Sequence, residues 1–97
     1  MLHTVVIKSI RHKGLRLYWE KGQTKGLPAQ QLPRIGRMLQ VLDAAEAPGD
    51  LDLPGYHFHP LKGREAGRYS LRVTGNYRLT FAFDGIDVVV LDYEDYH

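Results

Sequence analysis

The chain has 97 residues, of which 43% are hydrophobic and 25% are charged, and this composition predicts one small globular domain over residues 1–97. It contains no cysteine, which excludes a disulfide framework and thiolate chemistry. The longest apolar runs, at 88–91 and 5–7, are too short to span a bilayer, and the first residues lack the apolar core of a signal peptide. We therefore expect a cytoplasmic protein without a membrane partner.

The net charge of +2 conceals an uneven distribution. All thirteen Lys and Arg lie in residues 1–83 beside only six Asp and Glu, whereas residues 84–97 contain five acidic residues and no Lys or Arg. The basic excess of the first part indicates a polyanionic partner, although a solvated charged surface gives the same composition.

The first predicted elements are a strand and a helix. The β-branched residues at 5–7 predict a strand over roughly 5–10. In residues 11–21, Leu15, Tyr18 and Trp19 recur at helical spacing, which predicts a helix that ends at Gly22.

A second helix is predicted over about 30–45. Five apolar residues recur there at helical spacing, and Pro28 and Pro33 fit a first helical turn better than a helix interior. Residues 47–49 end this helix, and a loop follows over 51–55. The five apolar positions are Leu32, Ile35, Met38, Leu39 and Leu42.

The remainder of the chain alternates apolar and polar residues as strands do. We predict strands over 69–74, 77–83 and 87–93, separated by tight turns at Gly75-Asn76 and Asp84-Gly85. The fold class is therefore α+β, with two N-terminal helices packed on one face of a small, mainly antiparallel sheet. The other face should present polar side chains to water or to a ligand, namely Arg72, Arg78 and Thr80.

Basic and imidazole side chains concentrate between residues 57 and 78, and the given sequence closes on Asp95-Tyr96-His97. Cleavage of RNA without a metal uses the neighbouring 2′-hydroxyl as the nucleophile and needs a base, an acid and cations around the phosphate. His97 suits the base or the acid, Arg78 is a phosphate fork, and Lys62 is a phosphate clamp or a base. Each residue alone is more commonly structural, and the argument depends on their convergence. The cluster comprises His57, His59, Lys62, Arg64, Arg68, Arg72 and Arg78.

Other kinds of site have weaker support. His57 and His59 would share one side of a strand and could form a zinc site with His97, but the sequence lacks an HExxH pattern and a fourth ligand at motif spacing. Hydrogen-bonded strand histidines are the simpler interpretation. There is no P-loop, no Gly-rich dinucleotide turn and no nucleophile elbow, so we expect neither a metal nor another cofactor. Three acidic residues could bind a divalent cation but are more typical of a solvated edge: Asp92, Glu94 and Asp95. Tyr93 and Tyr96 could stack on a base, and Tyr93 could equally belong to the core.

Several short blocks occur in a fixed order between residue 6 and residue 97. They are His12-Lys13-Gly14-Leu15, Glu20-Lys21-Gly22, Pro28-Ala29-Gln30, His59-Pro60-Leu61-Lys62-Gly63, Gly67, Ser70-Leu71-Arg72-Val73, Asn76-Tyr77-Arg78-Leu79 and Asp95-Tyr96-His97. In order and spacing these blocks resemble the HigB toxins of the RelE superfamily of ribosome-dependent mRNA endonucleases. The chain departs from many relatives at Thr80, where they carry Cys, and at Gly75, where they carry a polar turn residue.

The resemblance implies a compact, microbial-RNase-like α+β domain that inhibits translation. It would cut mRNA in the ribosomal A site without metal and leave a 2′,3′-cyclic phosphate and a 5′-hydroxyl. Its partners would be the small ribosomal subunit, mRNA and a helix-turn-helix antitoxin of the HigA type, with operator DNA bound only through the antitoxin. The catalytic positions of the family fall on Lys62, Arg78, Asp95, Tyr96 and His97, with substrate contacts at His59 and Asn76. We add Arg64, Arg68 and Arg72 as contacts to the RNA backbone.

In this interpretation His97 exchanges protons and Asp95 orients it, while Lys62 and Arg78 bind the scissile phosphate and Tyr96 positions the substrate. The rival hypothesis is a basic RNA- or ribosome-binding module that blocks translation without cutting. The end groups of RNA incubated with the protein would distinguish the two.

Overall fold

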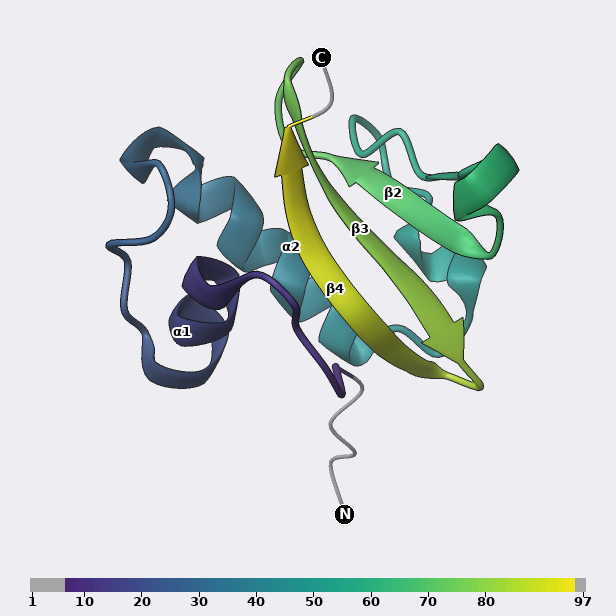
Figure 1. Cartoon of the computed structure of the whole chain (residues 1–97), viewed down its shortest axis with the longest axis horizontal. Coiled ribbons are helices and arrows are strands. Elements are labelled where there is room, and N and C mark those ends of the chain that lie inside the picture. Colours follow the sequence, from purple (N-terminus) through teal and green to yellow (C-terminus); the bar gives the residue numbers. More distant parts are fainter. Residues whose placement is uncertain (1–6, 96–97) are drawn as a thin grey trace.

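The computed structural model describes residues 7–95, which form two α-helices, three short 3₁₀ helices and one four-stranded sheet (Figure 1). Helix α2 crosses behind the sheet, and α1 lies beside α2 toward the β4 edge. The α+β class predicted from the sequence is therefore confirmed. The elements are α1 (Lys13–Lys21), η1 (Ala29–Gln31), α2 (Leu32–Ala44), η2 (Pro48–Leu51), β1 (His59–Pro60), η3 (Gly63–Glu65), β2 (Arg68–Arg72), β3 (Tyr77–Asp84) and β4 (Asp87–Asp95).

Helix α1 is closed at both ends by local hydrogen bonds. The Leu15 amide donates to Nδ1 of His12, the N-cap residue, over 3.1 Å, so the helix begins later than the predicted residue 11. Gly22 ends the helix in the left-handed conformation, with φ 71°, and its amide donates to carbonyls of the last turn. The predicted helix and its glycine stop are thus confirmed.

Helix α2 supplies most of the helical side of the core. Pro33 lies in its first turn, as predicted, and the 3₁₀ turn η1 leads into it. Four of the five apolar positions that predicted the helix are fully buried, and Leu32 is partly buried. The four are Ile35, Met38, Leu39 and Leu42.

Arg34 ties α2 to the rest of the molecule. Its guanidinium donates to the carbonyls of Gly55 and Arg72, at 2.6 and 2.8 Å, and stacks over the Tyr56 ring. This one side chain joins the helix, the loop before β1 and the end of β2.

The sheet is an antiparallel meander in the order β1-β2-β3-β4. The three predicted strands are confirmed, although β2 ends at Arg72 because the amides of Val73 and Thr74 both donate to the Tyr77 carbonyl in the turn. The turn between β3 and β4 contains Gly85 with φ 64°, a conformation that glycine adopts without strain.

A β-bulge interrupts the pairing of β3 with β4. The register moves from Thr80 opposite Asp92 to Ala82 opposite Val89, so β4 carries one extra residue there. Val90 lies in this bulge and has φ 47°. Because of the bulge, Val88 and Leu91 both point into the core, although they are three residues apart.

The N-terminal segment runs beside β4 without forming a full strand. Isolated parallel bridges join Ile7 to Val88 and Ile10 to Leu91, and the Ser9 hydroxyl accepts a hydrogen bond from the bulged Val90. The predicted strand over 5–10 is therefore reduced to two bridges within the described residues, since the bulge breaks the regular ladder. The segment still covers the β4 edge, which would otherwise be open for pairing with another chain.

One apolar core lies between α2 and the rear face of the sheet. Its fully buried strand residues are Leu71, Leu79, Phe81, Val88 and Leu91, and Leu15 joins them from α1. In residues 7–95, no helix is both long and apolar enough to cross a membrane.

Gly14 allows α1 to touch the following loop, and a methyl group there should destabilise the fold. A Cβ at Gly14 would lie 2.6 Å from the carbonyl oxygen of Gly26, and backbone atoms cannot rotate away. We expect Gly14→Ala to lower the free energy of unfolding by about 1–3 kcal/mol, despite the roughly 1 kcal/mol that alanine gains in a helix. Denaturant unfolding measures this. Gly49→Ala, whose Cβ would meet open space, is the control and should change stability by less than about 0.5 kcal/mol. Equal stability of the two variants would contradict the packing argument.

Candidate active site

The strand register brings the polar side chains of the sheet together on the face away from α2. Residues paired directly across antiparallel strands point to the same face. One row across the sheet therefore contains His59, Ser70, Thr80 and Asp92, and the neighbouring row contains Arg72, Arg78 and Glu94. These two rows contain three members of the 57–78 cluster, namely His59, Arg72 and Arg78.

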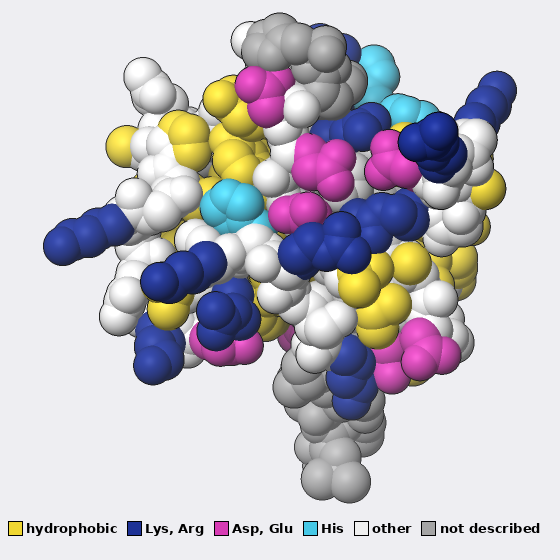
Figure 2. Space-filling view, viewed as in Figure 1, with side chains coloured by type: hydrophobic (Ala, Val, Ile, Leu, Met, Phe, Trp, Pro, Cys, Tyr) yellow, Lys and Arg dark blue, Asp and Glu magenta, His cyan; other side chains and the backbone are white. Residues whose placement is uncertain are grey.

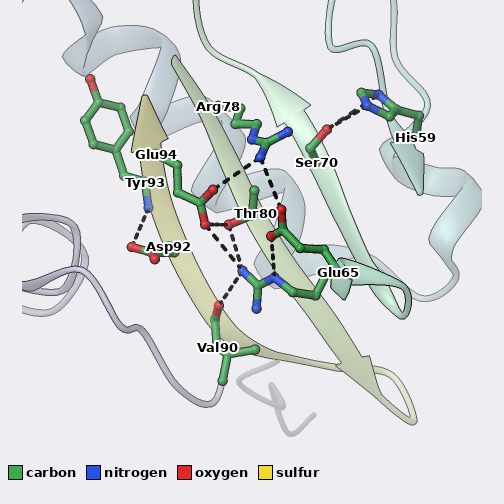
Figure 3. Close-up of polar contacts among 10 residues, drawn as sticks. His59, Glu65, Ser70, Arg78, Thr80, Val90, Asp92, Tyr93 and Glu94 are labelled. Atoms are coloured by element: carbon green, nitrogen blue, oxygen red, sulfur yellow. Dashed lines mark hydrogen bonds and ion pairs between the residues drawn. The ribbon is translucent and has the colours of Figure 1, made fainter. Parts of the chain in front are cut away.

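Two arginines and two glutamates form an ion-pair network over the middle of this face (Figure 3). Arg78 lies 3.3 Å from Glu94 and 3.7 Å from Glu65. Arg68 lies 3.9 Å from Glu65 and 4.0 Å from Glu94. The arginine side chains are only 15% and 16% exposed, so their charges need these partners. Each of the two arginines therefore contacts both carboxylates.

Thr80 lies beneath this network and is fully buried. Its hydroxyl donates to Glu94 over 2.8 Å and accepts from Arg68 over 2.7 Å. The expectation that Thr80 faces water or a ligand is therefore wrong, because Arg68 and Glu94 cover it. Arg68 also donates to the carbonyl of Val90, the bulged residue, so the bulge supplies one of its acceptors.

His59 is an exposed imidazole at the edge of the polar face. Its Nδ1 lies 2.7 Å from the His57 carbonyl, which can only accept, so Nδ1 carries the proton and donates. The basic nitrogen is then Nε2, which lies 3.3 Å from the Ser70 hydroxyl. In this tautomer Nε2 carries the lone pair that a general base requires.

His57 does not extend β1 as predicted. It adopts φ 49° and precedes the two-residue strand, so His57 and His59 are not two positions of one strand face. Its Nε2 lies 3.5 Å from the Arg72 guanidinium. Within residues 7–95, no three His, Cys, Asp or Glu side chains gather closely enough to hold a metal ion. The third proposed zinc ligand, His97, lies outside the described residues.

The other predicted cationic contacts lie at the border of the network. Lys62, Arg64 and Arg72 are exposed, with Lys62 and Arg64 next to or within η3 and Arg72 at the end of β2. Asn76 is exposed in the β2–β3 turn, where its amide donates to the Thr74 hydroxyl. These side chains are accessible to a substrate, whereas Arg68 and Arg78 are already engaged by carboxylates.

The C-terminal residues of the predicted site fall into two groups. Tyr96 and His97 lie outside the described residues. Asp95 pairs with Tyr77 across the sheet, so it belongs to the face opposite that of Arg78 and Glu94.

Tyr93 belongs to an aromatic cluster on the helix side of the sheet. Its ring stacks on Tyr77 at 5.1 Å and meets the edge of the His12 ring at 5.3 Å, while its hydroxyl donates to Gln31. Of the two roles weighed for Tyr93, packing fits these contacts, since Tyr77 already covers one ring face. Burial, followed by the nearby Tyr77 and Asp95 charges, raises the pKa of the Tyr93 phenol.

Two carboxylates of the site are not identifiable from the sequence pattern. Glu65 and Glu94 hold Arg68 and Arg78, although the sequence alone favours a solvated acidic edge for Glu94 and gives no sign of a role for Glu65. The only sequence signal for Glu94 is its place in a strand that follows the strand of Arg78. That signal is usable only when the register is known.

The basic charge that remains unpaired lies mainly elsewhere. Figure 2 shows acidic and basic side chains interleaved over the middle of the sheet, and Lys and Arg side chains projecting around α1 at the left. The six exposed cations of this second surface form no ion pair within residues 7–95. They are Lys8, Arg11, Lys13, Arg16, Lys21 and Lys25. We call this set the α1 basic surface.

Comparison with known proteins gives consistent matches. Residues 8–97 match the family described as the RelE-like toxin of type II toxin-antitoxin system HigB. The chain is 49% identical over 92 residues to the protein named Endoribonuclease HigB of Proteus vulgaris, covering 95% of this chain and 100% of that relative. It is 37% identical over 79 residues to Toxin HigB-1 of Vibrio cholerae serotype O1, covering 78% of this chain and 83% of that relative.

The environment of Tyr93 predicts a late phenol titration. Because its pKa is raised above the ordinary value of 10.0, the folded state favours the neutral phenol. Its contribution to stability should be complete below pH ~10 and should be lost as pH rises through the raised pKa. The absorbance change of tyrosinate formation, compared between the wild type and Tyr93→Phe while both remain folded, measures this. The absorbance step that the wild type shows and Tyr93→Phe lacks should have its midpoint above pH 10.0. A midpoint at or below that pH would contradict the burial argument.

Proposed function

The chain belongs to the HigB family of RelE-like toxins of type II toxin-antitoxin systems and is the endoribonuclease of such a pair, and we propose that it cuts mRNA in the ribosomal A site without a metal ion. The observation that supports the chemistry is the polar face of the sheet. There, the guanidinium groups of Arg68 and Arg78 share one face with the imidazole of His59, which contacts Ser70 on the intervening strand β2 (Figure 3). This combination provides phosphate binding and proton transfer from side chains alone.

The proposed reaction is attack of the 2′-oxygen on the adjacent phosphorus. A base takes the proton of the 2′-hydroxyl, the new oxygen–phosphorus bond forms, and the 5′-oxygen leaves with a proton from an acid. The products are a 2′,3′-cyclic phosphate and a 5′-hydroxyl. We assign the two proton transfers to His59, through Nε2, and to His97, with Asp95 and Tyr96 positioning His97 and the substrate.

The cations have separate tasks in this proposal. Arg78 stabilises the negative charge that grows on the phosphorane, and Lys62 binds the same phosphate from the turn beside it. Arg64 and Arg72 are exposed and can bind flanking phosphates, with Asn76 near Arg72 in the β2–β3 turn. Arg68 is held by Glu65, Glu94 and Thr80, so we propose that it supports Arg78 more than it contacts the RNA backbone.

The ribosome is proposed to align the substrate. Arg68 and Arg78 are each shared between two carboxylates, which weakens their attraction for free RNA. Holding the 2′-oxygen in line with the leaving oxygen can lower the barrier by several kcal/mol, about 7 or more in well-oriented systems. Such alignment would come from mRNA held in the A site, in the cytoplasm where ribosomes translate.

The family implies an antitoxin partner, and we propose one of the helix-turn-helix HigA type that also binds operator DNA. The alternative function is a non-catalytic module that binds RNA or ribosomes through the same basic residues. The α1 basic surface supports that alternative as well, because binding requires no proton transfer. Product chemistry separates the two: only cleavage leaves the cyclic phosphate and the 5′-hydroxyl.

Removing either proposed proton carrier should suppress cleavage with the fold intact. We expect His97→Ala and His59→Ala each to lower single-turnover cleavage of ribosome-bound mRNA by about 100-fold or more. A chelator selective for zinc and other transition metals, which leaves the Mg²⁺ of the ribosome in place, should not change the wild-type chemical step. His57→Asn is the matched control, because it removes an exposed neighbouring imidazole and asparagine tolerates the left-handed backbone there. It should stay within a few-fold of wild type. Full activity of His97→Ala would remove that residue from the mechanism.

Docking on ribosomal RNA should depend on identifiable cations. We expect Arg64→Glu with Arg72→Glu to reduce the salt dependence of ribosome binding by about two charges while sparing single-turnover cleavage at saturating protein. Lys13→Glu with Arg16→Glu makes the same charge change on the α1 basic surface and shows whether that surface docks instead. The same mRNA, free and in the A site, gives the decisive rates. If free RNA is cut as fast as ribosome-bound RNA, the proposed ribosome dependence is wrong.

A further inference from the structure

The two carboxylates of the ion-pair network are held very differently. The Glu94 side chain is 27% exposed, approaches Arg78 to 3.3 Å and accepts a hydrogen bond from the buried Thr80 over 2.8 Å. The Glu65 side chain is 46% exposed and lies 3.7 Å from Arg78 and 3.9 Å from Arg68. These longer contacts are ion pairs without hydrogen-bond geometry, so Glu65 is the weaker partner of Arg78. Arg68 lies about equally far from both carboxylates, at 3.9 Å from Glu65 and 4.0 Å from Glu94, but Glu94 also reaches Arg68 through the shared Thr80 hydroxyl.

The backbone that carries Glu65 differs from the backbone of Glu94 as well. Glu94 is part of the regular ladder of β4, opposite Arg78. Glu65 ends the three-residue turn η3, which begins at Gly63, with φ 68°, and is followed by Gly67, with φ 95°. A Cβ added at either glycine would meet nothing within 4 Å, so open space surrounds both connections. Glycines at both ends give this turn more backbone freedom than the strands have.

The position of Glu65 has the chemistry of a phosphate site. Its two carboxylate oxygens each face a different guanidinium, Oε1 toward Arg68 and Oε2 toward Arg78 (Figure 3). Phosphate also presents several acceptor oxygens and forms the same fork-like pairs with arginine. A phosphate that reaches Arg78 from the solvent side must therefore compete with the Glu65 carboxylate.

We propose that Glu65 is a displaceable counter-ion that occupies the phosphate position of the site until RNA replaces it. The identity of the substrate rests on the function proposed above, whereas the competition between Glu65 and phosphate does not. Glu94 remains bound to both arginines and keeps them in place during the exchange. In the absence of substrate, Glu65 and Glu94 together balance the charges of the two guanidinium groups, and Glu65 lowers their affinity for other anions.

The direct test compares phosphate binding by Glu65→Gln with binding by the wild type. Inorganic phosphate is titrated while the arginine side-chain resonances are followed by NMR, and an RNA oligonucleotide made uncleavable by 2′-deoxy substitution is titrated in parallel. We expect Glu65→Gln to bind both probes about two- to five-fold more tightly, the scale of a partly exposed ion pair. Glu65→Asp keeps the negative charge on a shorter side chain, so its phosphate affinity should lie between those of the wild type and Glu65→Gln.

The matched control is Glu20→Gln, which makes the same change of net charge at an exposed position on α1. It should leave phosphate affinity unchanged, and an equal gain there would reduce the effect to net charge and overturn the proposal. Adding Arg78→Ala to Glu65→Gln should abolish the gain. Weaker or unchanged phosphate binding by Glu65→Gln would also overturn it, since Glu65 would then be a structural partner. If the wild type cuts no RNA, free or ribosome-bound, the proposed function fails while these titrations still decide the role of Glu65.

Discussion

The structure depends on how two arginines are accommodated against the polar face of a small sheet. Arg68 and Arg78 are mostly buried, and a buried guanidinium requires both counter-charges and hydrogen-bond acceptors. Glu94 and Glu65 supply the charges, while Thr80 and the Val90 carbonyl supply acceptors. The result is a nearly neutral centre where the isolated sequence indicates a strongly basic one. The proposed binding of phosphate at this face would therefore depend on its carboxylates as much as on its arginines.

The same irregularity in β4 serves both the core and this centre. The bulge at Val90 lets Val88 and Leu91 share the core side and turns the Val90 carbonyl toward Arg68. It also limits pairing with the N-terminal segment to two bridges. β-Bulges are common beside active sites because they redirect groups without ending the sheet, and here one extra residue connects packing to electrostatics.

The two faces of the sheet differ in role, since one packs against the helices and the other carries the polar side chains. Tyr77, Tyr93 and the apolar residues face α2 and stabilise the domain, while His59, Arg78 and Glu94 lie on the opposite face, where we propose that the chemistry takes place. Within residues 7–95, Arg68 and Arg78 are paired with carboxylates, whereas exposed cations without an ion pair lie around α1 and at Lys62, Arg64 and Arg72. For the function proposed above, the pairing of Arg68 and Arg78 would weaken the attraction for free RNA, so that productive binding would require a substrate held in position by other contacts.

The sequence by itself determined the main secondary structure elements and the types of side chain available for chemistry. Helical spacing in 32–42 and alternation in 69–93 predicted α2 and the strands, because burial of one face leaves a period in the order of residues. The order of short blocks identified the family, and the residue types indicated phosphate chemistry.

Which charged and polar side chains contact each other was decided only by the tertiary structure. Arg78 meets Glu94 through the strand register, Glu65 reaches both arginines from a turn, and the His57 backbone fixes the tautomer of His59. The burial of Thr80 and the bulge at Val90 follow from the same packing. Such contacts depend on which residues face each other across strands and turns, and a one-residue change in register alters them all while leaving the sequence pattern of each strand unchanged.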